Sequence, residues 1–271
     1  MKSKLFDCVT FFQENLQMGL RFNILNEIVD KFVVCESIYD HRGQKKKINF
    51  SKDNFPKIRS KIEHVIITQK FPKNNTPWEN QSWQREFIFE GIKDSKDEDY
   101  IMFSDPDEIP NPQKLKDFKL KKKYGIFLQN MYTYKLNLFN KYESPWEGTR
   151  ICKKKYLKSV DWLRSNVLLK NLRYGFWRID KEKNIEIIND GGWHFNYLLK
   201  PSEISKKFKS LAETSWDKEE YSNEENIVKK IKLKKDLFNR GHIFELVKID
   251  QSYPKYLNEN KEKYKEWILD E

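Results

Sequence analysis

Short apolar runs alternate with helical patterns through the first half of the chain. Four runs rich in β-branched and aromatic residues predict buried strands, at 6–12, 31–37, 64–70 and 99–104. Apolar residues recur at helical spacing over 16–29, and a second helix is predicted to begin after Thr76, where Pro77 and Glu79 suit a capping box. Strands that are apolar throughout and alternate with helices predict a mostly parallel sheet covered on both faces.

The second half of the chain has a different pattern. A long aromatic run predicts a strand over 124–139, and shorter runs predict strands within 149–157, 174–180 and 185–195. Two helices are predicted over 202–213 and 224–240, the latter ended by Gly241, and a short helix over 258–269. The pattern therefore predicts an α/β fold in a single domain, 1–271, with a mixed or antiparallel C-terminal extension.

Three carboxylates directly follow the predicted strand at 99–104: Asp105, Asp107 and Glu108. In open α/β sheets, ligands bind at the carboxyl ends of the strands. Two carboxylates two residues apart suit Mg²⁺ or Mn²⁺, which take oxygen ligands and fill the remaining positions with water and substrate phosphates. The segment therefore indicates a binding site for a metal ion and a diphosphate. The alternative is a surface turn, because Asp and Pro are common turn residues.

Two further features are candidates for the same site. Arg85 lies in the apolar stripe of the predicted helix, where it either reaches out to solvent or pairs with a carboxylate or phosphate. Gly191 and Gly192 permit close backbone approach to a ligand, and Trp193 offers a stacking surface for a sugar. His194 follows them, and is either a ligand or a structural residue of the core.

Composition excludes several classes of protein. With 38% hydrophobic and 15% aromatic residues the chain can form a packed core, and no run reaches the ~18 apolar residues of a membrane-spanning helix. Three widely spaced cysteines exclude a disulfide framework and fit a reducing cytoplasm. The net charge of +11 comes from lysines interspersed with acids, which indicates a solvated surface rather than a nucleic-acid site.

Several segments, in order, resemble family-17 glycosyltransferases: 6–37, HRGQKK (41–46), QREFIFEGI (84–92), IMFSDPDEIP (101–110) and GGWHFNYL (191–198). The resemblance implies a GT-A-like fold with a Rossmann-like sheet, in which 1–123 binds a nucleotide sugar and 124–271 the acceptor. It implies an inverting transfer, with Asp105, Asp107 and His194 at a site for Mn²⁺ or Mg²⁺. The donor-binding residues that it implies are Glu36, Gly43, Lys46, Arg85, Gly192 and Trp193.

The resulting hypothesis is a metal-dependent transfer of GlcNAc from a UDP-sugar to a glycan hydroxyl, in which a carboxylate takes the proton of the attacking hydroxyl. Asp190 and Glu147 are the candidate bases. A metal-dependent nuclease or phosphohydrolase, and an inactive module that binds nucleotide sugars or glycans, are the alternatives. We expect a cytoplasmic protein with no nucleic-acid partner, and treat peripheral contact of its lysines with a membrane as a hypothesis.

Overall fold

The computed structural model describes residues 3–210 and 218–270. The first half contributes four parallel strands in the spatial order β3-β2-β1-β4. They are β1 (Leu5–Phe11), β2 (Lys31–Ser37), β3 (Ile62–Ile67) and β4 (Tyr100–Ser104). Each agrees with a predicted strand to within three residues at either end. The agreement is closest for β1, β2 and β4, because strands buried on both faces carry a continuous apolar signal.

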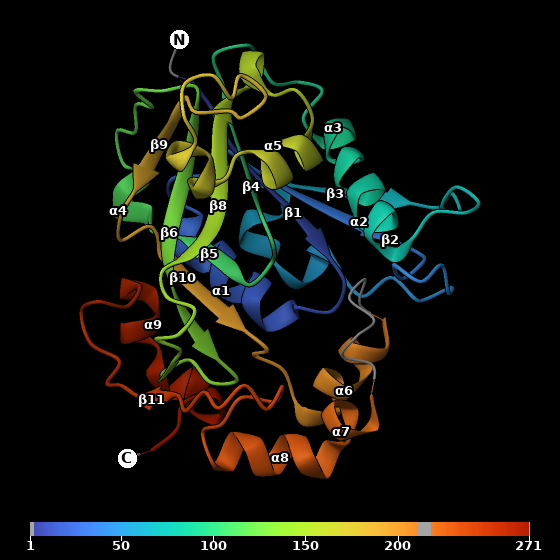
Figure 1. The fold of residues 1–271 in the computed structure, drawn as a ribbon, viewed down its shortest axis with the longest axis vertical. Helices are drawn as coiled ribbons and strands as arrows, with labels where there is room; N and C mark the ends of the chain where they lie inside the picture. Colours follow the sequence, from blue (N-terminus) through green and yellow to red (C-terminus); the bar gives the residue numbers. More distant parts are fainter. Residues whose placement is uncertain (1–2, 211–217, 271) are drawn as a thin grey trace.

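Helices cover both faces of this parallel sheet (Figure 1). On one face, Leu5 and Val9 of β1 pack with the apolar side of α1 (Asn15–Leu25). On the other face, Phe6 and Cys8 pack with three helices, α2 (Pro77–Glu86), α3 (Ile88–Gly91) and α5 (Val160–Asn166). The alternation along β1 follows from the two-residue period of a strand. The predicted capping box of α2 is present, since Thr76 Oγ1 accepts from Glu79 N while Glu79 accepts from Thr76 N.

The second half extends the same sheet with strands of both directions. In it β8 is antiparallel to β4 and β6, whereas β9 and β10 run parallel to β6. The strands are β5 (Glu108–Pro110), β6 (Tyr124–Thr133), β7 (Leu138–Phe139), β8 (Trp146–Lys153), β9 (Ile185–Ile188), β10 (Gly192–Asn196) and β11 (Glu245–Leu246). The fold is thus the α/β arrangement expected of a GT-A-like protein, with a parallel half and a mixed extension.

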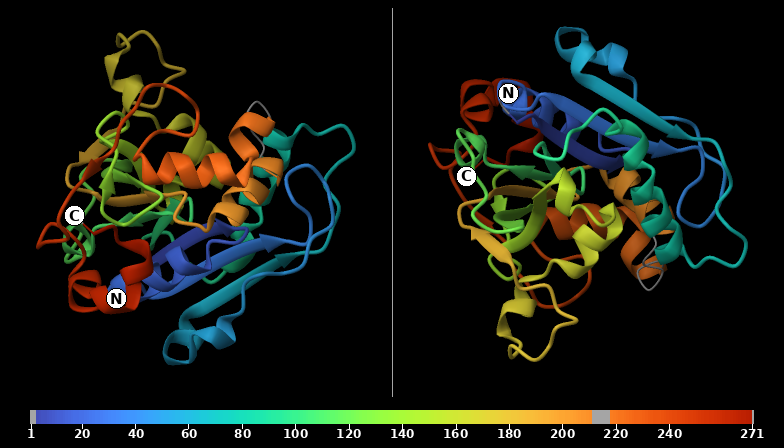
Figure 2. Two further views of the ribbon diagram at one scale, coloured as in Figure 1. Left: turned by 90° about the horizontal axis from the view of Figure 1, so that it is seen from below. Right: turned by 90° about the horizontal axis from the view of Figure 1, so that it is seen from above.

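Shorter helices surround the sheet (Figure 2). In the part of the chain that is described, no helix is long and apolar enough to cross a membrane. The remaining α-helices are α4 (Pro112–Leu115), α6 (Pro201–Ser210), α7 (Glu219–Ser222), α8 (Glu224–Lys232) and α9 (Lys255–Glu259). The 3₁₀ helices are η1 (Lys52–Asn54), η2 (Pro56–Lys61), η3 (Lys154–Tyr156), η4 (Leu169–Arg173) and η6 (Lys261–Trp267).

Four predictions for the second half need correction. The segment 174–180 forms no strand and lies exposed at the surface. The predicted strand 124–139 is divided into β6 and β7, because Tyr134 adopts a left-handed φ of 68°. The helix predicted to reach residue 240 ends at Lys232, ahead of the left-handed Lys234. The helix predicted over 258–269 is mostly the 3₁₀ helix η6. Of the helix predicted over 202–213, residues 211–213 lie outside the described part.

Candidate active site

The carboxylates after β4 lie at the edge where the parallel strands end. Parallel pairing sets Phe11 beside Glu36 and Val9 beside Ser104, so the ends of β1, β2 and β4 meet at one edge of the sheet. After Ser104 the chain makes a tight turn, closed by a hydrogen bond from Glu108 N to Asp105 O (3.0 Å). The turn then enters β5, which pairs with β10 and thereby brings His194 opposite Glu108.

The three carboxylates differ in burial and in partners. Glu108 is fully buried and accepts hydrogen bonds from Trp146 Nε1 (2.7 Å) and Arg164 Nη2 (2.6 Å). Asp105 is partly exposed and accepts from the same Arg164 nitrogen at 2.7 Å. Asp107 is nearly buried, with its Oδ1 lying 3.4 Å from His194 Nε2. One guanidinium therefore holds two of the carboxylates, and a histidine faces the third.

Charge neighbours keep both aspartates ionised. Burial alone would raise the pKa of Asp105, but the guanidinium groups of Arg164 and Arg85 outweigh it and hold that pKa below its usual range. Burial likewise opposes ionisation of Asp107, and the neighbouring His194 outweighs it, so its pKa is also lowered. The pKa of His194 is raised, because Asp107 more than offsets the burial that would lower it. The pair is therefore an aspartate facing a histidine that favours its charged form.

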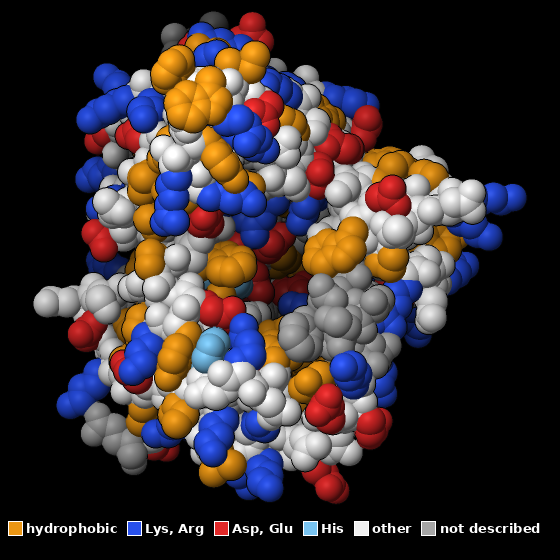
Figure 3. All heavy atoms as spheres, in the orientation of Figure 1, with side chains coloured by type: hydrophobic (Ala, Val, Ile, Leu, Met, Phe, Trp, Pro, Cys, Tyr) orange, Lys and Arg blue, Asp and Glu red, His pale blue; other side chains and the backbone are white. Residues whose placement is uncertain are grey.

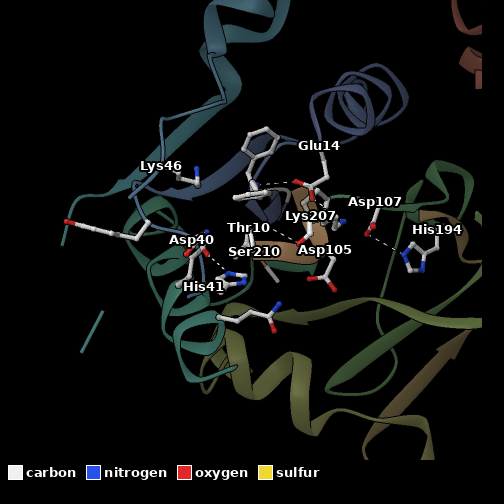
Figure 4. Close-up of a pocket in the computed structure, with 16 residues that line it drawn as sticks. Thr10, Glu14, Asp40, His41, Lys46, Asp105, Asp107, His194, Lys207 and Ser210 are labelled. Atoms are coloured by element: carbon white, nitrogen blue, oxygen red, sulfur yellow. Dashed lines mark hydrogen bonds and ion pairs between the residues drawn. The ribbon is translucent and has the colours of Figure 1, made fainter. Parts of the chain in front are cut away.

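These aspartates open into a cavity of about 190 Å³ (Figures 3 and 4). Figure 3 shows the face hollowed at its centre, with acidic side chains inside the hollow. Figure 4 shows Asp105 and Asp107 on one side of this space and Asp40, His41 and Lys46 on the other. The residues that line the cavity are Thr10, Phe11, Phe12, Glu14, Tyr39, Asp40, His41, Lys46, Gln81, Gln84, Asp105, Pro106, Asp107, His194, Lys207 and Ser210.

Of the predicted site residues, the structure therefore brings four together at the cavity: Lys46, Asp105, Asp107 and His194. Lys46 follows β2 on a loop that Glu36 organises. The carboxylate of Glu36 is fully buried and accepts from Lys46 Nζ (2.5 Å) and from the backbone amides of Asn49 (2.8 Å) and Phe50 (3.0 Å). Glu36 is thus beneath the cavity wall rather than in it, a correction to its predicted place beside the nucleotide.

Other predicted donor residues lie outside the cavity lining. Gly43, with φ 81°, has open space around it in the turn closed by its amide on Asp40 O. Arg85 pairs with Asp161 of α5 at 2.7 Å, so it braces a neighbouring helix and acts on Asp105 only through its charge.

The glycine–tryptophan pair has a structural explanation. Trp193 is buried in the core and donates from Nε1 to Ser252 O (3.2 Å), which corrects its prediction as an open stacking surface for a sugar. Gly192 has φ 129°, and a Cβ there would lie 2.1 Å from Ile109 O. The glycine therefore permits close pairing of β10 with β5, and not the approach of a ligand.

The two candidate bases have different surroundings. Asp190 is 87% exposed in its side chain, forms an ion pair with Lys114 at 3.7 Å, and does not line the cavity. Glu147 also lies outside the cavity lining; it is partly buried on β8, where it accepts from the backbone amide of Leu169 (2.9 Å) and pairs with Arg150 (3.3 Å). The residues on either side of Glu147 contact the carboxylate cluster, because Trp146 donates to Glu108 and Gly148 O accepts from Arg164.

Among the residues of the site that were not predicted from the sequence, three form ion pairs: Arg164, Lys207 and Glu14. Arg164 lies on α5, and nothing in the segment around it sets it apart from a surface arginine. Lys207 of α6 and Glu14, at the start of α1, both line the cavity and form an ion pair at 3.3 Å. Burial would lower the pKa of Lys207, but Glu14 and Asp107 raise it, so the ammonium is retained. Their pairing joins segments far apart in sequence, which no local pattern reveals.

The carboxylates at the cavity suit a hard divalent cation that takes most of its ligands from water and from phosphate oxygens. Among the described residues, no group of three or more His, Cys, Asp and Glu is arranged to hold a metal ion. Two ionised carboxylates nevertheless face one cavity, and Mg²⁺ and Mn²⁺ commonly take one or two carboxylates together with water and substrate phosphates. Asp105 and Asp107 therefore fit a metal that arrives with, or is completed by, a phosphate-bearing ligand.

Comparison with known protein families gives a match over nearly the whole chain. The model of glycosyltransferase family 17 matches residues 1–269. The human and rat proteins named β-1,4-mannosyl-glycoprotein 4-β-N-acetylglucosaminyltransferase are each 28% identical over 103 residues, covering 34% of this chain. The matched region spans only 19% of the length of these relatives.

Solved structures show only distant likeness. Glucosyl-3-phosphoglycerate synthase from Mycobacterium tuberculosis, in complex with Mn²⁺, UDP and glucosyl-3-phosphoglycerate, aligns with a TM-score of 0.36 and 12% identity, covering 70% of this chain and 71% of that one. A 4-diphosphocytidyl-2C-methyl-D-erythritol synthase aligns with a TM-score of 0.37 and 12% identity, covering 69% and 90%. Likenesses this distant carry no argument about activity or ligands.

Proposed function

The chain belongs to glycosyltransferase family 17, and on that basis we propose that it transfers GlcNAc from a UDP-sugar to a hydroxyl of a glycan, with inversion at the anomeric carbon. The sugar is proposed from the names of the human and rat relatives, which are N-acetylglucosaminyltransferases. Family membership also supports sugar transfer over the phosphodiester hydrolysis that the sequence left as one alternative.

The observation that carries this proposal is the pair of ionised carboxylates, Asp105 and Asp107, in a cavity that also contains two lysines. Lys46, on the loop after β2, and Lys207, on α6, both supply positive charge to the cavity. A nucleoside diphosphate is a ligand whose charge suits both sets of groups, since the lysines attract its phosphates and the carboxylates attract its cation. Phe11, Phe12 and Tyr39 give the same cavity aromatic surface for a base.

In the proposed site, Asp105 and Asp107 would hold Mn²⁺ or Mg²⁺, which when bound neutralises charge on the leaving diphosphate. Arg164 fixes the carboxylate of Asp105 by its 2.7 Å hydrogen bond. His194 faces Asp107 and keeps it ionised. The side chains of this chain thus orient the two carboxylates before any ligand binds, which lowers the cost of assembling the site.

We propose Glu147 rather than Asp190 as the base that takes the proton of the acceptor hydroxyl. Its backbone lies between Trp146 and Gly148, both of which contact the Arg164–Glu108 cluster, whereas Asp190 is at the exposed end of the turn before β10. Inversion requires the base to act on the face of the sugar opposite the leaving diphosphate, and Glu147 comes from β8 whereas the proposed metal ligands come from the β4 turn.

Calorimetry with UDP and UDP-GlcNAc, with and without Mn²⁺, tests the donor site. We expect binding that depends on Mn²⁺ and that weakens at least about a hundredfold in Asp107→Asn, because the variant removes a charged ligand. Asp53→Asn, which changes an exposed aspartate of η1, is the matched control and should bind as the wild type does. In the same series, Glu147→Gln should keep donor binding and lower the rate of UDP release with a glycan acceptor about 10²–10⁴-fold.

A different experimental result would contradict each part of the proposal: the metal site, the sugar and the transfer reaction. Equal Mn²⁺-dependent binding by wild type and Asp107→Asn would remove the metal site from the β4 turn. Binding of another UDP-sugar in place of UDP-GlcNAc would overturn only the choice of sugar. Donor binding without transfer to any glycan would favour a nucleotide-sugar binding module over an enzyme.

A further inference from the structure

A loop between α5 and β9 presents large apolar side chains to solvent. Within this 170–183 loop, Phe176 is 88% exposed, Trp177 70% and Ile179 94%. Leu172 and Tyr174 on its approach are also exposed. Scattered apolar side chains are normal at a surface, but a run of five on one short loop is a contiguous feature that indicates an interaction site.

The loop has a defined internal structure. Trp177 packs over Gly175, where an added Cβ would lie 2.4 Å from its ring, and Phe176 meets the same ring edge-on at 5.4 Å between centroids. Backbone hydrogen bonds join Arg178 N to Gly175 O (3.1 Å) and Ile179 N to Trp177 O (2.9 Å). The backbone thus turns tightly at the tip, and the apolar side chains are held outward instead of folding back onto the sheet.

Positive charge surrounds the apolar tip. The loop itself carries five basic and two acidic residues, and Asp180 is already paired with Arg178 at 2.7 Å. A second basic segment lies against the base of the loop, because Lys121 N donates to Glu186 and Lys123 N donates to Asn184. The exposed lysines of that segment are Lys119, Lys121, Lys122 and Lys123.

The loop projects from the body away from the cavity. It is the gold segment that leads into β9 at the top of Figure 1, whereas α6, which lines the cavity, lies in the lower part of the view. Both views of Figure 2 show it standing out from the rest of the chain. None of its residues lines the cavity, so an occupant of the loop leaves the entrance to the donor site open.

We propose that the 170–183 loop docks the protein on an anionic phospholipid bilayer, with Phe176, Trp177 and Ile179 inserted among the headgroups and the surrounding lysines and arginines on the lipid phosphates. The charge is complementary to such a surface, and basic side chains near it add to the attraction. A narrow projecting tip suits insertion into a deformable bilayer, where aromatic side chains favour the interface, better than it suits a flat protein surface. This proposal is independent of the proposed transfer reaction.

Co-sedimentation of the full chain with vesicles tests this proposal. We expect binding to phosphatidylcholine–phosphatidylserine vesicles at about 2:1 that exceeds binding to phosphatidylcholine alone and weakens with added salt. Phe176→Ser with Ile179→Ser should reduce the partition coefficient at least about tenfold. Leu233→Ser with Ile243→Ser is the matched control, since it removes two exposed apolar side chains elsewhere and should bind as the wild type does.

A charge variant separates the two contributions. Lys121→Glu with Lys122→Glu should weaken binding to the anionic vesicles and leave the residual binding to phosphatidylcholine unchanged. No sedimentation above a lipid-free control would overturn the proposal and leave a protein partner as the occupant. An equal loss in the loop variant and in the Leu233/Ile243 control would overturn it as well, because the binding would then not be specific to the loop. Far-ultraviolet circular dichroism of each variant checks that the fold is retained.

Discussion

Arg164 is the cation that holds the carboxylates of the β4 turn. Its guanidinium donates to Asp105 (2.7 Å), to Glu108 (2.6 Å) and to Gly148 O (2.9 Å), with only 12% of its side chain exposed. Glu108 has no access to solvent, and Arg164 donates to both of its carboxylate oxygens. The site is therefore organised by a residue that itself does not line the cavity.

Replacement of this cation should destabilise the whole fold. We expect Arg164→Met to lower the free energy of unfolding by about 3–5 kcal/mol, because it leaves the buried carboxylate of Glu108 without its ion-pair partner. Urea denaturation measures this difference. Arg178→Met removes an exposed bidentate pair with Asp180 and should leave the unfolding free energy unchanged within error. A similar loss in both variants would show that the buried cluster is not the source of the effect.

Which site residues the sequence predicts depends on how local their signal is. Asp105 and Asp107 were predicted because they directly follow a strand whose apolar pattern locates them, and His194 because it follows a pair of glycines in a segment that resembles the family. Arg164 and Lys207 were not, because each meets its partners only through the tertiary fold. Trp193 shows the opposite error, since an aromatic beside glycines resembles a ligand platform until the packing of β10 on β5 is known.

At the scale of elements, Glu36 joins the end of β2 to the loop that supplies Lys46. Burial would raise the pKa of Glu36, but His64 at 3.6 Å and the hydrogen bonds from Lys46 and the amide of Asn49 outweigh it and lower that pKa below its usual value. A carboxyl whose pKa is lowered on folding contributes stability above its unfolded pKa of about 4.3, and loses it as the pH falls through the folded value. The anchoring of this loop is therefore sensitive to acid.

This gives a prediction for the pH dependence of stability. Glu36→Gln should have a lower free energy of unfolding than the wild type at pH 7. The difference between the two proteins should decrease as the pH falls below about 4.3. Urea midpoints measured across this range test it. Glu63→Gln changes a half-exposed position of β3, and its difference in free energy of unfolding from the wild type should not change with pH. If the difference in free energy of unfolding between Glu36→Gln and the wild type stays constant with pH, the ionised form of Glu36 is not what stabilises the loop.

Elements were predicted best where burial agrees with propensity. β1, β2 and β4 are buried on both faces, so a continuous apolar run is itself the signal of their position, whereas β3 at the sheet edge exposes Glu63 and Ile66. The segment 174–180 has the same aromatic and β-branched composition but lies at the surface, so its apolar residues form a loop tip and not a strand. Composition alone does not separate these cases, because the difference lies in what the side chains contact.

At the scale of the whole molecule, β8 joins the two halves of the sheet. It pairs with β4 of the first half and with β6 of the second, and α1 near the N-terminus packs with α9 near the C-terminus. The cavity likewise takes residues from both halves, among them Glu14 and Lys207. These shared contacts support our proposal that 1–271 forms a single domain.

A single domain should unfold in one cooperative transition. Urea titrations followed by far-ultraviolet circular dichroism and by tryptophan fluorescence should coincide, because tryptophans occur in both halves of the chain. Two separated transitions, or one half that melts first, would contradict the proposal and indicate two folding units joined at β8.

The pairing of early with late segments around the cavity also has a consequence for biosynthesis. Asp107 leaves the ribosome well ahead of His194 and Lys207, the two cations that lower its pKa. At about 5–20 residues per second, the interval between Asp107 and His194 lasts roughly 4 to 17 seconds. During that interval the nascent chain holds its strand-end carboxylates without these counter-charges, so the proposed donor site is completed only as the last third of the protein is translated.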